Sequence, residues 1–148
     1  MLDFARLEIR VADDEGFRAH AYQDTVGVWT IGYGSTRING EPVTETTPAI
    51  SEPDARRLLR ADLYNALITC QAIYENYDQL SPARQEVLAN MAYNLGAAGL
   101  SRFKRMNEAV RRHDILAWCA EMRASKWWNQ VGNRAPRLQA AVRAGQWA

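Results

Sequence analysis

The sequence predicts an α+β protein with a small antiparallel sheet in its first third and helices after it. Residues 21–43 interleave β-branched and aromatic residues with glycines, and they contain Asn39-Gly40, the strongest short-range hairpin signal. From residue 51 onward, apolar residues instead recur at the three- and four-residue spacing of amphipathic helices. A chain of 148 residues suits one domain, or two small lobes that share one core.

The first element is a short helix over residues 3–13. Phe4, Leu7 and Val11 recur at helical spacing, and an acidic run that ends in Gly16 then interrupts the pattern. The sheet that follows is expected to contain three strands, with a tight turn at Asn39-Gly40.

A long helix is expected over residues 51–78. Ser51 is a suitable capping residue, Glu52 and Asp54 place acids in the first turn, and no glycine or second proline follows before Asp78. At about 1.5 Å per residue, such a helix would extend about 40 Å, which predicts a bridge between two lobes.

The remaining chain is read as four further helices. Starts are expected at Ser81-Pro82, Ser101, Asp114 and Ala135-Pro136, and ends at Gly96 and Gly145. The expected organisation is a sheet lobe over residues 14–50, an interlobe helix over 51–78, and a helical lobe over 79–148 that includes the N-terminal helix.

Composition excludes several classes of protein. With 47% hydrophobic and 24% charged residues, the chain is neither disordered, collagen-like nor a coiled coil, and no apolar run approaches the roughly 20 residues that span a bilayer. The net charge of +1 conceals an asymmetry, because residues 1–101 carry a net −6 and residues 102–148 a net +7. A basic C-terminal block is typical either of a polyanion-binding surface or of a solvated helical face.

Neither the cysteines nor the histidines indicate a metal site or other cofactor. Cys70 and Cys119 fall on apolar helical faces and match no metal-ligand spacing, so free, packed thiols are expected. His20 is read as a bystander on the hairpin, and His113 as a residue at a helix junction.

The residues that carry chemistry lie between positions 15 and 34. Glu15 follows a helix, Asp24 begins a hairpin, and Thr30 lies on the opposing strand. Glycosidic bond hydrolysis needs one carboxylic acid to protonate the leaving oxygen and a second carboxylate on the opposite face. Apolar walls would raise the pKa of a general acid, and Phe17, Trp29 and Tyr33 are candidates for such walls.

Three motifs resemble those of one known family, the phage-type lysozymes of glycoside hydrolase family twenty-four. They are Glu-x8-Asp-x5-Thr followed by Ile-Gly-x-Gly, the segment Asn-Met-Ala-Tyr-Asn-Leu-Gly at 90–96, and Trp-Trp-Asn-Gln-Val-Gly-Asn-Arg-Ala-Pro-Arg at 127–137. They occur in the family's order and cover essentially the whole chain.

The resemblance implies a lysozyme-like fold and hydrolysis of the β-1,4 bond between N-acetylmuramic acid and N-acetylglucosamine in bacterial peptidoglycan. Glu15 would be the general acid, Asp24 the carboxylate across the sugar and Thr30 the holder of the attacking water in an inverting mechanism. Arg134 would pair with Glu15. Thr36, Tyr93 and Asn94 would bind substrate. Independently of the resemblance, Trp128 is a further candidate, because aromatic planes bind sugars.

The resemblance also implies a monomer that needs no metal or cofactor and binds neither nucleic acid nor, stably, a membrane. Without an apolar signal core in its first 17 residues, the chain would remain in the host cytoplasm until it is released to the wall.

Two points stay open at the level of sequence. The T-even phage type has His after Ile-Gly-x-Gly, in a buried ion pair with an Asp of the interlobe helix, whereas this chain has Ser35.

The alternative function is a catalytically weak wall- or polyanion-binding module of the same fold. A helical nucleic-acid binder is less favoured, because no recognition-helix motif is present.

Overall fold

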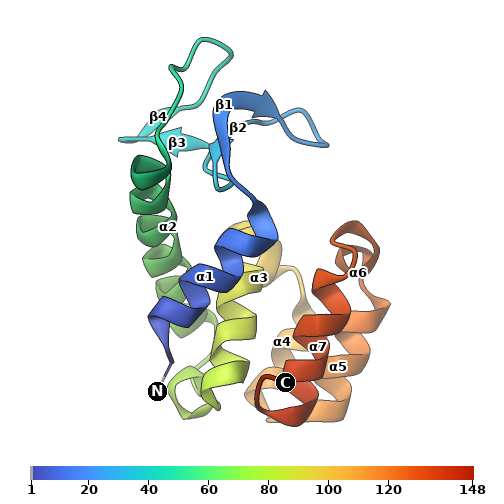
Figure 1. Cartoon of the computed structure of the whole chain (residues 1–148). Helices are drawn as coiled ribbons and strands as arrows, with labels where there is room; N and C mark the ends of the chain where they lie inside the picture. The colour runs from blue at the N-terminus through green and yellow to red at the C-terminus, as the bar shows by residue number, and fades with distance from the viewer. Residues whose placement is uncertain (1) are drawn as a thin grey trace. The chain divides into compact units, whose positions relative to one another are not determined.

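The computed structural model describes residues 2–148 and contains two compact units. One unit spans Ala5–Tyr64, and the other contains Asn65–Ala148 together with residues 2–4. Figure 1 labels the elements of both. The lobe boundaries expected from the sequence stay a prediction. The first helix, which was expected with the helical lobe, falls in the unit that also holds the strands.

The first unit contains α1 (Phe4–Glu15) apart from its first residue, two β-hairpins and the N-terminal part of α2 (Glu52–Ile73). The strands are β1 (Arg18–Gln23), β2 (Trp29–Gly32), β3 (Arg37–Ile38) and β4 (Glu41–Pro42). α1 presents Leu7 and Val11 to the interior, as its apolar spacing predicts. An ion pair joins α1 to α2 within this unit, with Arg60 Nε 2.6 Å from Glu8 Oε1.

The expectation of one three-stranded sheet is wrong. β1 pairs with β2 and β3 pairs with β4, each as a separate antiparallel ladder, and only an isolated bridge joins Ile31 to Ser35. Gly32 and Gly34 have φ of 68° and 91°, so the chain turns sharply after β2 instead of extending into a third strand. The hairpin signal itself is confirmed, because Asn39 and Gly40 both have positive φ, as a type I′ turn requires.

α2 begins where the sequence predicts and ends earlier. Ser51 Oγ accepts a hydrogen bond from Asp54 N at 3.2 Å, as a capping residue should. The helix stops at Ile73, and a short 3₁₀ helix, η1 (Tyr77–Gln79), follows. The expected end at residue 78 is therefore wrong. Tyr77 of η1 is buried, and its hydroxyl donates to Gln85 O at 2.6 Å.

The second unit is helical: α3 (Pro82–Ser101), α4 (Lys104–Arg111), α5 (Ile115–Ala124), α6 (Lys126–Gln130) and α7 (Arg134–Ala144). α5 packs against both α4 and α7, with Trp118 fully buried among them (Figure 1). Trp127 also lies in this core, whereas Trp147 only packs against it and, like Trp29 of the first unit, is half-buried. Cys70 and Cys119 are free and buried, as the sequence predicts.

The predicted helix ends are mostly confirmed. Gly96 breaks the helical geometry within α3 (φ 74°, ψ 169°), Asp114 caps α5, and Gly145 ends α7 in the left-handed conformation. The start predicted at Ser101 is wrong, because its hydroxyl donates back to Ala97 O at 2.7 Å and α4 begins only at Lys104. The five-residue helix α6 was not predicted.

Candidate functional site

Asp24 lies in the loop that joins β1 to β2, and its side chain organises that loop. Its Oδ1 accepts hydrogen bonds from Val26 N and Val28 N, both at 2.9 Å. The backbone closes the same turn, since Asp24 N donates to Val28 O at 2.9 Å and Gly27 adopts φ 86°. The side chain remains exposed, and Oδ2 makes no hydrogen bond within residues 2–148. One oxygen is therefore committed to the loop, and the other can meet a ligand.

Thr30 lies on β2 and is only 4% exposed. Its hydroxyl donates to Val28 O at 2.9 Å, so the hydrogen of that hydroxyl is committed to the protein. The oxygen can still accept, and a water that met it would donate one hydrogen to Thr30.

Glu15 is the last residue of α1 and is half-buried. Gly16 ends the helix in the left-handed conformation (φ 72°), and its N–H donates to Ala12 O at 2.9 Å. Glu15 is thus placed by a rigid helix end and Asp24 by a hairpin loop, which are separate elements of the same unit.

Tyr22 connects these residues, although the sequence reading did not select it for the site. It is the direct cross-strand partner of Thr30, so both side chains lie on the same face of the hairpin. Burial raises the pKa of the Tyr22 hydroxyl, the Arg18 cation opposes this, and the carboxylates of Glu15 and Asp24 add to it. The guanidinium of Arg18 lies 4.2 Å from the centre of the Tyr22 ring. The available sequence signal was its place two residues before Asp24.

Two residues that were candidates for an apolar wall, Phe17 and Tyr33, lie against each other. Their ring centroids are 5.6 Å apart, with Phe17 39% exposed and Tyr33 buried. The Tyr33 hydroxyl donates to Glu52 Oε1 at 2.8 Å, and burial together with this bond raises its pKa. The Arg56 guanidinium lies 5.1 Å from the Tyr33 ring and, through its bond to Glu52, lowers the pKa of that carboxyl. Tyr33 is therefore anchored to α2.

Ser35 makes a hydrogen bond to a carboxyl of α2. It is 2% exposed, and its Oγ donates to Asp62 Oδ2 of α2 at 3.2 Å. Burial raises the pKa of Asp62, and the bond from Ser35 lowers it in part. Ser35 thus links the segment after β2 to α2 through a side-chain hydrogen bond.

The remaining predicted residues have defined surroundings. Thr36 is exposed in the first unit, and its carbonyl accepts from Val43 N at 2.9 Å. In the second unit, Tyr93 is half-buried, and Asn94 is exposed with its Oδ1 accepting from Trp127 Nε1 at 3.0 Å.

Arg134 is buried in the second unit, and its Nε donates to Asn90 Oδ1 at 2.9 Å. Trp128 is half-buried there beside the Arg123 guanidinium, which lies 5.2 Å from the indole ring. Whether the residues of the second unit act with Glu15 and Asp24 stays a prediction.

Neither a metal-binding cluster nor a transmembrane helix is found in residues 2–148. No three of their His, Cys, Asp or Glu side chains are grouped so that they could hold a metal ion. None of the helices formed there combines the length and the apolar character that a membrane crossing requires.

Comparisons with known proteins agree on one family. The sequence profile described as "Phage lysozyme" matches residues 12–144. "Probable T4-type lysozyme 2" of Dictyostelium discoideum is 24% identical, with 89% of this chain and 90% of that protein covered. "SAR-endolysin" of Escherichia phage 933W is 25% identical, over 90% of this chain and 72% of that protein. The solved "Endolysin from Escherichia coli O157:H7 phage FAHEc1" shares the fold, with a TM-score of 0.77, 21% identity and coverage of 96% and 93% of the two chains.

Proposed function

The chain belongs to the phage lysozyme family, and on that premise we propose that it is a muramidase that cleaves the β-1,4 bond between N-acetylmuramic acid and N-acetylglucosamine in bacterial peptidoglycan. The observation that carries the proposal is that Glu15 and Asp24, from separate elements, both act electrostatically on Tyr22, the cross-strand partner of Thr30. Two carboxylates, one as acid and one as base, are the groups that glycoside hydrolysis needs.

In the proposed reaction, the carboxylic acid of Glu15 gives its proton to the glycosidic oxygen as the bond to the anomeric carbon breaks. A water attacks that carbon from the opposite face and transfers a proton to Asp24. Because the Thr30 hydrogen is held by Val28 O, this water would donate to the Thr30 oxygen as well as to Asp24. With both of its hydrogens directed to the protein, the water would present a lone pair to the sugar, and the configuration would invert.

The proposal extends to the supporting residues and to the setting of the reaction. Arg134 would assist Glu15, and Thr36, Tyr93 and Asn94 would contact the glycan or its N-acetyl groups. The protein would act as a monomer on the cell wall after its release from the host cytoplasm.

The test of the catalytic assignment is the release of reducing ends from purified peptidoglycan. Glu15→Gln keeps the size of the side chain and removes the acid, so we expect a loss of about 10²–10⁴-fold in rate. Asp24→Asn is the sharper variant, because the amide oxygen can still accept from Val26 N and Val28 N and so preserve the loop. Activity of either variant within threefold of the parent would remove that residue from the proposed mechanism.

Two further measurements address the alternative and the stereochemistry. The basic segment of residues 102–148, with 10 basic and 3 acidic residues, favours a wall- or polyanion-binding module as the second candidate. Sedimentation with walls but no release of reducing ends by the parent protein would establish that module and reject the enzyme. If the parent is active, proton NMR of the first product should detect the α-anomer. An initial β-anomer would reject inversion.

A further inference from the structure

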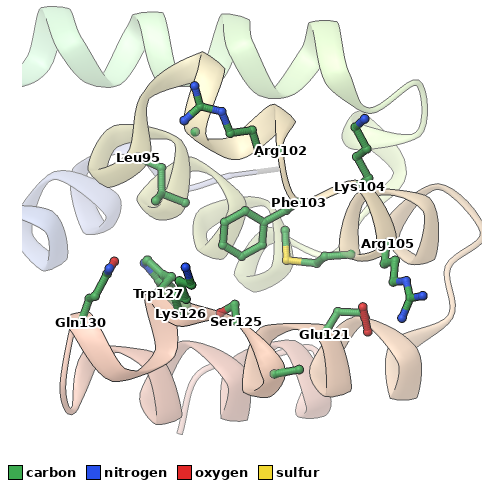
Figure 2. A pocket seen from close by; sticks show the side chains of 13 residues that line it. Leu95, Arg102, Phe103, Lys104, Arg105, Glu121, Ser125, Lys126, Trp127 and Gln130 are labelled. Carbon is green, nitrogen blue, oxygen red and sulfur yellow. The ribbon is translucent and has the colours of Figure 1, made fainter.

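The second unit contains a cavity of about 470 Å³ that no catalytic assignment uses. It lies where the end of α3, the start of α4, the end of α5 and the short helix α6 come together (Figure 2). Its apolar lining comes from Leu95, Phe103, Met106 and Trp127, of which Met106 and Trp127 are buried. A hollow of this size is within the usual range for a small-molecule site.

The side chains around this cavity are mainly cationic. Arg102, Lys104, Arg105 and Lys126 line it and are exposed, and the only carboxylate in the lining is Glu121. None of these five charged groups makes an ion pair with any residue from 2 to 148, whereas the arginines of α2 and the end of α4 do pair with acids. In Figure 2, the cations come from both sides of the cavity, and Glu121 lies on the side of Arg105.

Two of these cations occupy positions that do not favour the helix carrying them. Lys104 and Arg105 are in the first turn of α4, where the helix dipole favours acids, and that turn contains no acidic residue. The residue before it, Phe103, makes no capping hydrogen bond through its side chain. Helix stability therefore does not account for the placement of these two cations.

We propose that this cavity binds a phosphate-bearing amphiphile, in which a phosphate group is joined to an apolar chain or ring. The phosphate would lie among Lys104, Arg105 and Lys126, because several oxygens and a charge of up to −2 suit cations that come from separate elements. The apolar part would pack on Phe103, Met106 and Trp127. The same chemistry occurs in a lipid headgroup with its acyl chain and in a free phosphate ester.

The first experiment uses three soluble probes on the whole protein: hexyl phosphate, inorganic phosphate and 1-hexanol. NMR of the indole N–H groups reports the location, since the Trp127 signal should shift saturably while that of Trp29, which does not line the cavity, stays unchanged. We expect hexyl phosphate to bind at least about tenfold more tightly than either partial probe. The proposal would be overturned if inorganic phosphate or 1-hexanol bound as tightly as hexyl phosphate, or if the Trp127 signal did not shift.

Charge variants test which residues are used. Lys104→Gln and Lys126→Gln should each weaken hexyl phosphate binding about fivefold. This is the loss expected when one Lys or Arg no longer faces the phosphate groups of a ligand. Glu121→Gln should tighten it, because a like charge is removed. Arg123→Gln is the matched control, since Arg123 is an exposed cation of α5 that does not line the cavity. An equal loss in the Arg123→Gln control would show that net charge alone sets the affinity, and no gain with Glu121→Gln would show that the phosphate does not lie near that carboxylate. Either result would overturn the site.

Vesicles separate the two sources of the ligand. Co-sedimentation with phosphatidylglycerol vesicles that is lost in Lys104→Gln/Lys126→Gln, with none on phosphatidylcholine, would assign the site to a lipid headgroup. Binding of hexyl phosphate without binding to either vesicle would assign it to a soluble phosphate ester.

Discussion

Replacing Ser35 by alanine should lower the stability of the protein by an amount that depends on pH. The variant removes the hydroxyl that donates to Asp62 Oδ2 at 3.2 Å, a bond from a buried donor to a half-buried carboxyl. Hydrogen bonds to charged groups contribute about 1.5–3 kcal/mol. The long distance and the partial exposure of Asp62 place the expected loss in free energy of unfolding at about 1–2 kcal/mol at neutral pH. In a chain of this size, that corresponds to about 2–8 °C in Tm.

The pH dependence follows from the direction of the Asp62 shift. Burial raises its pKa above the ordinary value of 3.8, so the folded state binds the proton more tightly than the unfolded state does. Ionisation of Asp62 therefore opposes folding. The cost is fully present above the folded pKa and disappears as the pH falls below 3.8. Ser35→Ala removes the bond that lowers this pKa, so its destabilising effect should be largest at pH 7 and should shrink toward pH 3.5.

The measurement is urea denaturation followed by circular dichroism at several pH values between 3.5 and 7. Ser101→Ala is a suitable control, because that hydroxyl donates to a neutral carbonyl, Ala97 O, and its loss should not depend on pH. A difference below 0.3 kcal/mol for Ser35→Ala at pH 7 would show that the bond does not stabilise Asp62. A pH-independent difference of any size would refute the assignment of the effect to its ionised form.

Three further predictions concern the fold. Gly32→Ala should cost about 2 kcal/mol or more, because Gly32 has φ 68° and an added Cβ would lie 3.1 Å from Ala55 Cβ; thermal melting would reveal it, and an unchanged Tm would contradict the stated strain. Tyr74→Phe should cost about 1–3 kcal/mol, since its hydroxyl donates to Asn107 Oδ1 within the core and the amide oxygen would lose that donor. Urea titration measures this, and a neutral result would mean that water replaces the hydroxyl. Burial raises the pKa of Cys70 to about 12, so Cys70 should react with a thiol reagent at pH 8 only after unfolding. Rapid labelling in the native state would contradict that.

Local signals in the sequence were sufficient for much of the fold. Gly96, Asp114 and Gly145 act through their own backbone or their nearest neighbours, so their positions predict helix ends directly. Asn39-Gly40 acts in the same way at its turn. The helix wrongly expected from Ser101 shows the limit of such signals, because a serine can cap a helix that follows or bond back to the one that it ends.

Features that depend on distant residues could not be predicted. The partner of Ser35 is 27 positions away on α2, and no glycine or proline in the sequence marks the end of that helix at Ile73. At the candidate site, the motif indicated Glu15, Asp24 and Thr30, but the role of Tyr22 became visible only when the strand register paired it with Thr30. Periodicity predicts which face a residue occupies and leaves open what it meets there.

The irregular pairing of β1 with β2 affects which changes in length the hairpin could accept. Arg18 pairs with Gly32 and Tyr22 with Thr30, so β1 uses two more residues than β2 over the same stretch of ladder. Because side chains alternate with a period of two, removal of a single residue between these pairs would turn Arg18 to the opposite face from Tyr22. Loss of two residues from β1 would leave Arg18 and Tyr22 on one face and would remove only the irregularity in the pairing. Among natural relatives, length variation in this segment is therefore expected in steps of two residues, a parity imposed by strand geometry on the spacing between Glu15 and Asp24.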